Sequence, residues 1–394
     1  MTKIPRASAP HRRRAGSGAM SRVARLAFVS TPGGNRPRAS RRRGAVTPRA
    51  ARSDRRAENV PGEFFVDHTC IDCDACRWLA PGTFTRVGGM SAVTTQPHAP
   101  DARATALRAL LSCPTSSIHL DAPADEVKRA HEDFPHRLRL PADDDDAAKT
   151  SSTSGFRAYH LGFHSRRSYG AAPYLIALPR GRGCVMVDCP RWTPSLAARL
   201  RNPGAFGPVL AIILTHKDDV ADHERWAAAL DVPRVLHAAD VTPGTRDVEH
   251  KLEGNGPWTV RAIGADGVPA KATVVDLAGE TPTDADRELL LVHTPGHTTG
   301  CVSVFCAPLR ALFTGDHLCG RGGETEPRDA GASRLTAMPR YCWGDWSEQR
   351  RSVEKLVGLE FDAVFPGHGR PATFEGGVEE KDEALRELLA NEPE

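Results

Sequence analysis

Short apolar runs that end on histidine or aspartate dominate the C-terminal part of this chain. Residues 209–214 are continuously apolar and predict a buried strand, and residues 224–230 predict a helix. The polar stretch between them opens with Thr215 and His216 and closes with Asp222 and His223. Three later runs, 289–292, 311–314 and 363–365, lead to His293 and His297, to Asp316 and His317, and to His368. Imidazoles and carboxylates that gather at a sheet edge predict a metal site.

The rest of this region follows the same alternation of strands and helices. Residues 174–178 and 184–188 are apolar runs separated by a turn, and they predict a hairpin whose second strand ends on Asp188. Helical spacing returns over residues 353–357 and 384–389. Strand blocks interrupted by surface helices imply sheets sandwiched between helices, an α/β fold.

Charge is distributed unevenly along the 394 residues. Residues 1–53 hold 14 Lys+Arg and no acidic residue, so the overall +3 (52 basic, 49 acidic) leaves 38 basic against 49 acidic residues, or −11, for the remainder. An acidic body argues against nucleic-acid binding. No apolar run approaches the roughly 18 residues of a membrane span, which predicts a protein without one.

The basic N-terminus has the composition of an organellar transit peptide. Residues 1–57 are rich in Arg, Ala, Ser, Gly and Pro and lack the apolar core of a secretory signal. We expect a disordered targeting segment that directs the protein to the plastid (chloroplast), with the mitochondrion as the alternative. A basic tail without a targeting role, or one that grips RNA, is the other interpretation.

Four of the ten cysteines have the spacing of an iron–sulfur site. Cys70, Cys73 and Cys76 form C-x2-C-x2-C, and Cys113 follows a segment with helical spacing and precedes Pro114. This arrangement resembles single-cluster bacterial-type ferredoxins and implies one [4Fe-4S] cluster in a small α+β domain over residues 58–122. A structural zinc site fits less well because zinc ribbons usually offer two C-x2-C pairs. The six scattered cysteines are expected to be buried free thiols in a reducing compartment.

Residues 123–155 separate this domain from the metal-site region. They contain four consecutive aspartates, 143–146, and a Ser/Thr-rich tail. Such a charge run predicts a solvated acidic linker.

Residues 156–394 resemble the metallo-β-lactamase superfamily, whose fold is an αββα sandwich with the metals at one sheet edge. The matching segments stand in family order at Asp188, at Thr215-His216, at residues 295–298, at residues 314–317 and at residues 366–369. The resemblance implies two divalent metal ions (zinc, or iron or manganese) and a ligand set of His216, His297, Asp316, Asp222, His223 and His368. It gives Asp188 the role of orienting a ligating histidine.

The first histidine cluster departs from the family motif H-x-H-x-D-H. Asp218 stands in place of the second histidine, and two additional residues precede Asp222-His223. Asp218 replaces the missing imidazole, or Asp219 or Asp222 does, or one metal site is lost. An additional carboxylate would favour iron or manganese over zinc. His293 and His317 are either outer partners of the ligands or exposed.

Two aromatic segments bear on the substrate. Residues 159–169 line the pocket mouth or form an edge strand with a solvated face. Tyr341, Trp343 and Trp346 wall an active site or pack in the core.

These features predict a metal-dependent hydrolase of a small-molecule thioester or ester, as in glyoxalase-II-like members of the superfamily. Water on the metal attacks the carbonyl, and Asp218 or Asp222 takes the proton. One alternative is a redox enzyme in which the cluster passes electrons from an electron-transfer partner to a di-iron site. The other is an iron–sulfur redox sensor with a degenerate metal site.

Overall fold

Two seven-stranded sheets form the larger part of the computed structural model, which describes residues 55–121, 124–141, 155–202, 204–263, 269–322 and 334–392. The first sheet has the order β11-β10-β9-β8-β7-β6-β5. Its strands are β5 (His136–Arg137), β6 (Arg157–His160), β7 (Tyr174–Ala177), β8 (Cys184–Val187), β9 (Val209–Ile213), β10 (Arg234–His237) and β11 (His250–Leu252). β9 is buried throughout, and β7 and β8 form the predicted antiparallel hairpin.

The second sheet has the order β13-β12-β14-β15-β16-β19-β20. Its strands are β12 (Trp258–Ile263), β13 (Pro269–Asp276), β14 (Leu290–His293), β15 (Val302–Cys306), β16 (Ala311–Gly315), β19 (Ala363–Pro366) and β20 (Ala372–Thr373). A two-stranded ribbon of β17 (Cys319–Gly320) and β18 (Leu335–Thr336) lies between β16 and β19 in the chain. Three strands of the second seven-stranded sheet, β14, β16 and β19, are the strands predicted to end on the candidate ligands.

Parallel pairing brings the chemically important strand ends to common edges. β8 and β9 are parallel neighbours, so Asp188 and His216 leave the first sheet at the same end. β16 and β19 are parallel neighbours in the second sheet, so Asp316 and His368 do likewise. Backbone hydrogen bonds then tie the two sheets together at this edge, from Val302 N to Thr215 O (2.9 Å) and from Ala172 N to Gly367 O (2.8 Å).

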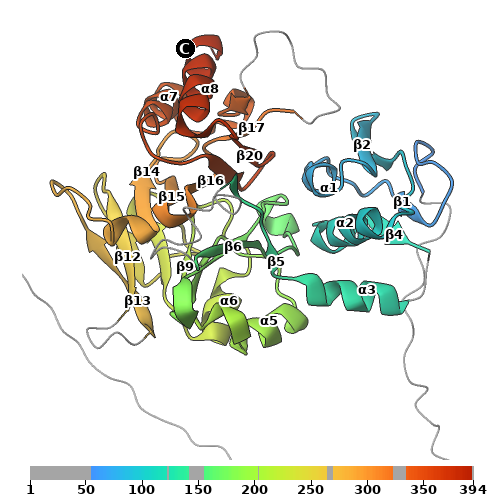
Figure 1. Ribbon diagram of the computed structural model, residues 1–394, viewed down its shortest axis with the longest axis horizontal. Helices are drawn as coiled ribbons and strands as arrows, with labels where there is room; N and C mark the ends of the chain where they lie inside the picture. Colours follow the sequence, from blue (N-terminus) through green and yellow to red (C-terminus); the bar gives the residue numbers. More distant parts are fainter. Residues whose placement is uncertain are drawn as a thin grey trace, which may run out of the picture. The chain divides into compact units, whose positions relative to one another are not determined.

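Apolar packing arranges the two sheets as the inner layers of an αββα sandwich. One buried cluster contains residues of both sheets, including Ile176, Leu291 and Phe313. A second lies between the first sheet and helices α5 (Pro194–Arg201) and α6 (His223–Leu230), and a third between the second sheet and helices α7 (Trp346–Glu354) and α8 (Gly377–Asn391). Figure 1 shows α5 and α6 on one outer side of the sheets and α7 and α8 on the other. The predicted fold class is confirmed.

Residues 55–121 form a small α+β unit with its own apolar cluster. β1 (Phe64–Val66) pairs antiparallel with β4 (Ile118–Leu120), and β2 (Phe84–Val87) pairs with β3 (Met90–Val93). Two helices, α1 (Ala75–Leu79) and α2 (Pro100–Ser112), pack on these strands around Phe64 and Phe84.

Part of the segment predicted as an acidic linker has regular structure. It contains helix α3 (Ala124–Ala130), and β5 pairs antiparallel with β6 in the first sheet. Burial of Phe134 and Leu140 explains why this stretch is ordered, since neither side chain can remain in a solvated linker without loss of apolar burial. The four aspartates 143–146 lie outside the described residues. Pairing with β5 also makes β6 an inner strand, so residues 157–160 are not an edge strand.

Residues 1–54 also lie outside the described residues, so the targeting prediction and the plastid location stay predictions. Within the described ranges, no helix is long and apolar enough to cross a membrane. All ten cysteines are free; among the six scattered ones five are buried, and Cys342 is partly exposed.

Candidate metal centre and iron–sulfur site

His216 is oriented by a relay of hydrogen bonds from the neighbouring strand end. Asp188, which follows β8, accepts hydrogen bonds from the backbone N and the Oγ1 of Thr215, both at 2.9 Å. The same Oγ1 lies 3.0 Å from Nδ1 of His216. Because the hydroxyl donates its proton to Asp188, it accepts from His216, which assigns the imidazole proton to Nδ1 and leaves the Nε2 electron pair free for a cation. Asp188 therefore positions the histidine through Thr215, for which the sequence predicted no role of its own.

Two histidines and two carboxylates converge at the strand ends. Asp316 Oδ2 lies 3.7 Å from Nε2 of His216 and 3.6 Å from Nε2 of His297. Asp218 Oδ2 lies 3.6 Å from Nε2 of His297 and 4.0 Å from Nε2 of His216. The ligand atoms of His216, Asp218 and His297 all fall within 4.8 Å of one another.

A second group shares His216 and adds a buried carboxylate. The ligand atoms of His216, Asp219 and Asp316 also lie within 4.8 Å of one another, and all three residues are buried. His368 borders this group, with Nδ1 at 2.8 Å from Oδ1 of Asp316 and 3.8 Å from Oδ2 of Asp219. Of the three aspartates that competed in the sequence, Asp218 thus lies in the first group, Asp219 in the second and Asp222 in neither.

Unpaired atoms in the centre fit divalent cations. Among the described residues, His216 Nε2, His297 Nε2 and Asp219 Oδ2 are buried and have no hydrogen-bond partner. A buried polar atom without a partner costs free energy, and a cation bound by nitrogen and oxygen ligands removes that cost. The donor set therefore fits one or two metal ions.

Burial and neighbouring charges act in opposite directions on the pKa values of Asp316 and His368. Burial acts to raise the pKa of the Asp316 carboxyl, but His368, His216 and His297 together outweigh it and hold that pKa below its ordinary value. Burial acts to lower the pKa of His368, while Asp316 and Asp219 raise it to about 10. Burial and the nearby Asp316 charge raise the pKa of Asp219 well above its ordinary value. The Asp219 and Asp316 carboxylates thus repel each other, and a bound cation would relieve this repulsion.

Comparison with known proteins gives the family. The family model described as "Metallo-beta-lactamase superfamily" matches residues 170–368, which are 199 of the 394 residues. The chain belongs to the metallo-β-lactamase superfamily. A second family model, described as "4Fe-4S single cluster domain of Ferredoxin I", matches residues 66–120. Both predicted resemblances are therefore confirmed.

One curated relative of this superfamily member is "Probable metallo-hydrolase YflN" of Bacillus subtilis (strain 168). It is 28% identical over 249 residues, which cover 56% of this chain and 89% of the relative. Among solved structures, BLEG-1 B3 metallo-beta-lactamase matches with a TM-score of 0.38 and 19% identity over 59% of this chain and 99% of that chain. A metallo-β-lactamase from Erythrobacter litoralis matches with a TM-score of 0.38 and 14% identity over 66% and 98%.

Two residues that the family motif suggested as ligands, Asp222 and His223, do not join the centre. Asp222 has left-handed backbone geometry (φ 54°), and its carboxylate accepts from Trp192 N at 2.8 Å and from Arg167 at 3.2 Å. Nδ1 of His223 accepts from the Arg234 guanidinium at 3.1 Å. Both side chains are engaged elsewhere, so we leave them out of the proposed ligand set and leave Asp222 out of the catalytic assignment.

His293 and His317 are also outside the centre and are not exposed. His293 stacks on His237 with ring centroids 4.4 Å apart and donates from Nε2 to Thr299 O at 3.0 Å. His317 is fully buried, and burial lowers its pKa to about 3. Neither belongs to the two groups of converging ligand atoms.

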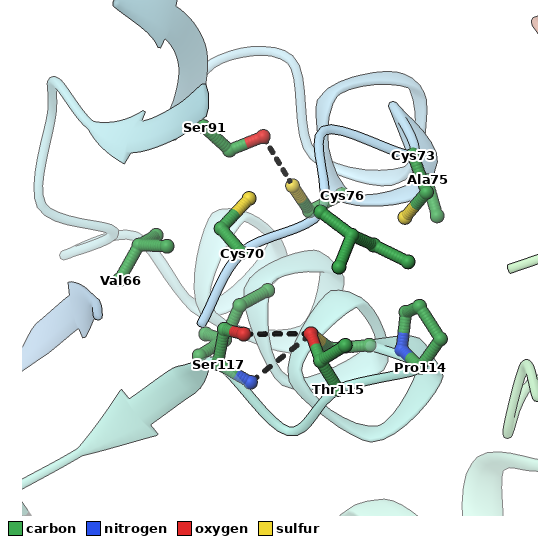
Figure 2. Close-up of a pocket in the computed structure, with 12 residues that line it drawn as sticks. Val66, Cys70, Cys73, Ala75, Cys76, Ser91, Pro114, Thr115 and Ser117 are labelled. Carbon is green, nitrogen blue, oxygen red and sulfur yellow. Dashed lines mark hydrogen bonds between the residues drawn. The ribbon is translucent and has the colours of Figure 1, made fainter. Parts of the chain in front are cut away.

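The predicted cluster cysteines gather around one cavity of the small α+β unit. Cys70, Cys73, Cys76 and Cys113 line a space of about 310 Å³, part of it open to solvent. Figure 2 shows the side chains of Cys70, Cys73 and Cys76 around this space, with Ser91 against Cys76 and Ser117 near Thr115. The sulfur of Cys113 accepts from Ser117 N at 3.3 Å, and the sulfur of Cys76 lies 3.2 Å from Ser91 Oγ.

The chemistry of these thiols fits a cluster. Burial raises the pKa of Cys73 to about 12, and burial together with Cys73 raises the pKa of Cys76 well above its ordinary value. Iron bound to the sulfurs would stabilise the thiolate forms, and hydrogen bonds to the sulfurs tune such clusters. Of the four cysteines, Cys113 comes from the end of α2 and the other three from the loop and first turn of α1.

The cysteine loop contacts residues that flank the metal centre. Asp74 forms an ion pair with Arg370, in which Oδ2 of Asp74 lies 2.8 Å from Nε of Arg370. Arg370 stands two residues after His368. Arg191 donates to the carbonyl oxygen of Cys113 at 2.7 Å. Gly170 lies so close to Cys73 that a Cβ on the glycine would stand 3.1 Å from the cysteine sulfur.

Proposed function

We propose that this protein is a metallo-hydrolase that cleaves a small-molecule ester or thioester at the His216, His297, Asp218, Asp219 and Asp316 centre, with His368 beside it. The observation that carries the proposal is that His216 Nε2, His297 Nε2 and Asp219 Oδ2 have no hydrogen-bond partner among the described residues and belong to two groups of converging ligand atoms that share His216. Membership of the superfamily and the similarity to a relative named as a probable metallo-hydrolase support it.

His216, His297, Asp219 and Asp316 would hold the metal, and the count of ions and their identity are part of the proposal. A divalent cation bound there polarises a carbonyl oxygen and lowers the pKa of water. The Asp188 and Thr215 relay keeps His216 in the tautomer that presents Nε2.

Asp218 faces both the ligands and the solvent. Its side chain is 46% exposed, while its Oδ2 lies 3.6 Å from Nε2 of His297. The adjacent His297 holds the pKa of Asp218 below its ordinary value, so the carboxylate stays ionised at neutral pH. An ionised carboxylate at the solvent side of the centre can accept a hydrogen bond from an attacking water and orient it.

The test compares two histidines that stand seven residues apart. Metal-loaded protein is assayed on simple esters and thioesters, and bound metal other than cluster iron is measured for the wild type, His216→Ala and His223→Ala. We expect His216→Ala to lower both metal content and kcat/KM, the latter by at least about 100-fold, as loss of a ligand does. His223→Ala should keep both within about threefold, because His223 contacts Arg234 instead. An inactive wild type, or equal losses in both variants, contradicts the proposal.

A second candidate, electron delivery from the cluster to iron at the His/Asp centre, is favoured by the Asp74–Arg370 and Gly170–Cys73 contacts. Metal and labile-sulfide analysis of protein purified without oxygen separates the two functions. Iron well beyond the roughly four atoms of one cluster, with little zinc, supports the redox candidate. About four iron atoms together with zinc support the hydrolase.

A further inference from the structure

We propose that Tyr169, Tyr341 and Trp343 form an aromatic substrate-binding wall at the metal centre, and that the substrate carries an aromatic group on its scissile carbonyl. This inference rests on the proposed ester or thioester hydrolysis and adds the class of substrate to it.

Exposure singles these residues out. Three large hydrophobic side chains are exposed in the part of the chain that the structure describes: Tyr169 at 63%, Tyr341 at 61% and Trp343 at 69%. Apolar surface of this size is favourably removed from water when a ligand covers it. Tyr169 neighbours His368, and Tyr341 and Trp343 belong to a loop whose ends contact the segments of His368 and His297, so the exposed aromatic surface is not scattered over the molecule.

Tyr169 lies beside His368. Its ring centroid is 6.4 Å from that of His368. Its backbone is held in a left-handed turn (φ 48°), a conformation that bulky residues rarely adopt. Tyr169 N donates to Arg166 O at 3.2 Å, and Gly170 N to Ser165 O at 2.8 Å. Burial of the Tyr169 side chain does not stabilise this strained backbone conformation, because the ring is exposed. Strain of this kind is typical of ligand-binding positions.

Tyr341 and Trp343 stand on a loop that is fixed at both ends. At one end, Met338 has left-handed geometry (φ 54°), and its sulfur lies 4.0 Å from where a Cβ on Gly369 would stand. At the other end, Asp345 N donates to Gly296 O at 2.9 Å, and Cys342 Sγ lies 3.3 Å from the same oxygen. This loop therefore spans the segments that carry His368 and His297.

Tyr169 and the loop of Tyr341 and Trp343 thus adjoin two different residues of the centre, His368 and His297. Tyr169 stands at the His368 side, and the backbone next to Trp343 rests on the segment of His297, since a Cβ on Gly344 would stand 2.4 Å from Gly296 O. Fixed aromatic side chains bind planar groups by offset or edge-to-face stacking without ordering a mobile loop. An aryl group attached to a carbonyl at the metal centre would meet such surfaces on both sides.

The experiment compares the S-benzoyl and S-acetyl thioesters of N-acetylcysteamine. Wild type, Trp343→Ala, Tyr169→Ala and the conservative Trp343→Phe are assayed, and binding of benzoate and of acetate to metal-loaded protein is measured by calorimetry. We expect the wild type to prefer the benzoyl substrate and to bind benzoate more tightly than acetate. Trp343→Ala and Tyr169→Ala should each lower the benzoyl-to-acetyl ratio of kcat/KM and the benzoate affinity about tenfold, whereas Trp343→Phe should keep both within about threefold.

The outcomes separate this inference from the proposed function. Benzoate binding that depends on Trp343, without hydrolysis of either thioester, supports the aromatic wall and overturns the hydrolase. Hydrolysis with the same benzoyl-to-acetyl ratio in all variants overturns the wall and leaves the hydrolase. If Trp343→Ala changes only the oligomeric mass, these side chains contact a second copy of the chain instead of a substrate. That result also contradicts the proposed aromatic wall.

Discussion

At the scale of single residues, His293 shows how a histidine next to the metal centre serves stability instead of coordination. Its side chain is 7% exposed, and it stacks on His237 and donates to Thr299 O. Burial lowers the pKa of His293 to about 4; the Thr299 carbonyl and Asp240 act against this shift, and His237 and Lys355 add to it. The folded protein therefore holds this imidazole neutral.

This pKa predicts an acid-dependent loss of stability. Above a pH of about 6.5 the histidine is neutral in both the folded and the unfolded chain, so its contribution is fully present. As the pH falls from about 6.5 to 4 the unfolded chain binds a proton that the folded chain does not, and the free energy of unfolding decreases by up to about 3 kcal/mol. Urea unfolding between these pH values should show a shallower decrease for His293→Gln than for the wild type, and parallel curves would contradict the prediction.

At the scale of elements, helix α7 supports the loop that carries His297. Ser352 Oγ donates to Pro295 O at 2.7 Å, and Gln349 Nε2 donates to His317 O at 3.1 Å and to Ala337 O at 2.8 Å. The backbone of Gly296 lies directly on this helix, where a Cβ would stand 2.2 Å from Gln349 Cβ. The position of His297 therefore depends on a close approach that only glycine permits.

Gly296→Ala should accordingly displace α7 from the metal centre. The collision with Gln349 comes in addition to the cost of its positive φ (144°), so we expect a loss of about 3 kcal/mol or more in the free energy of unfolding and weaker metal binding. Gly358→Ala is the matched control, because Gly358 also has a positive φ (86°) but no atom lies within 4 Å of its Cβ position. It should cost about 1 to 2 kcal/mol and leave metal affinity unchanged. Chemical unfolding and competition with a metal chelator measure both effects, and equal losses in the two variants would argue against the support role of α7.

At the scale of the whole molecule, the described residues between Arg55 and Glu392 belong to one compact unit, in which the cysteine loop contacts the metallo-β-lactamase domain. The Asp74–Arg370 pair and the Arg191 bond to Cys113 O join loop and domain through charged groups. Gly170 joins them by close packing, since its Cβ position is 2.9 Å from Cys73 Cβ. The cluster ligands are thus held in part by the catalytic domain.

Cluster assembly should therefore respond to a substitution in the catalytic domain. A methyl group at Gly170 would displace Cys73, and we expect Gly170→Ala to lower the labile sulfide and the visible absorbance of the cluster by more than half. Gly181→Ala, with a positive φ (68°) and open space around it, should retain the cluster. Full occupancy in Gly170→Ala would show that the loop binds the cluster without this contact.

The sequence by itself determined the features that depend on local pattern. The apolar runs before His216, His297, Asp316 and His368 predict strands because continuous apolar segments of this length are buried, and parallel strands then carry their ends to one edge. The C-x2-C-x2-C spacing predicts the cluster loop because three thiolates two residues apart can wrap one corner of it.

Only the tertiary structure showed that Asp218 and Asp219 lie among the candidate ligands and that Asp222 does not. Asp218, Asp219 and Asp222 are equally plausible by spacing, but the left-handed turn at Asp222 directs its carboxylate to Trp192 N, and Arg234 engages His223. Tertiary structure also showed that Tyr341 and Trp343 are exposed, since composition does not tell whether a tryptophan side chain is buried in the core or exposed to solvent. In both cases the answer depends on contacts between segments far apart in the chain, which no local pattern contains.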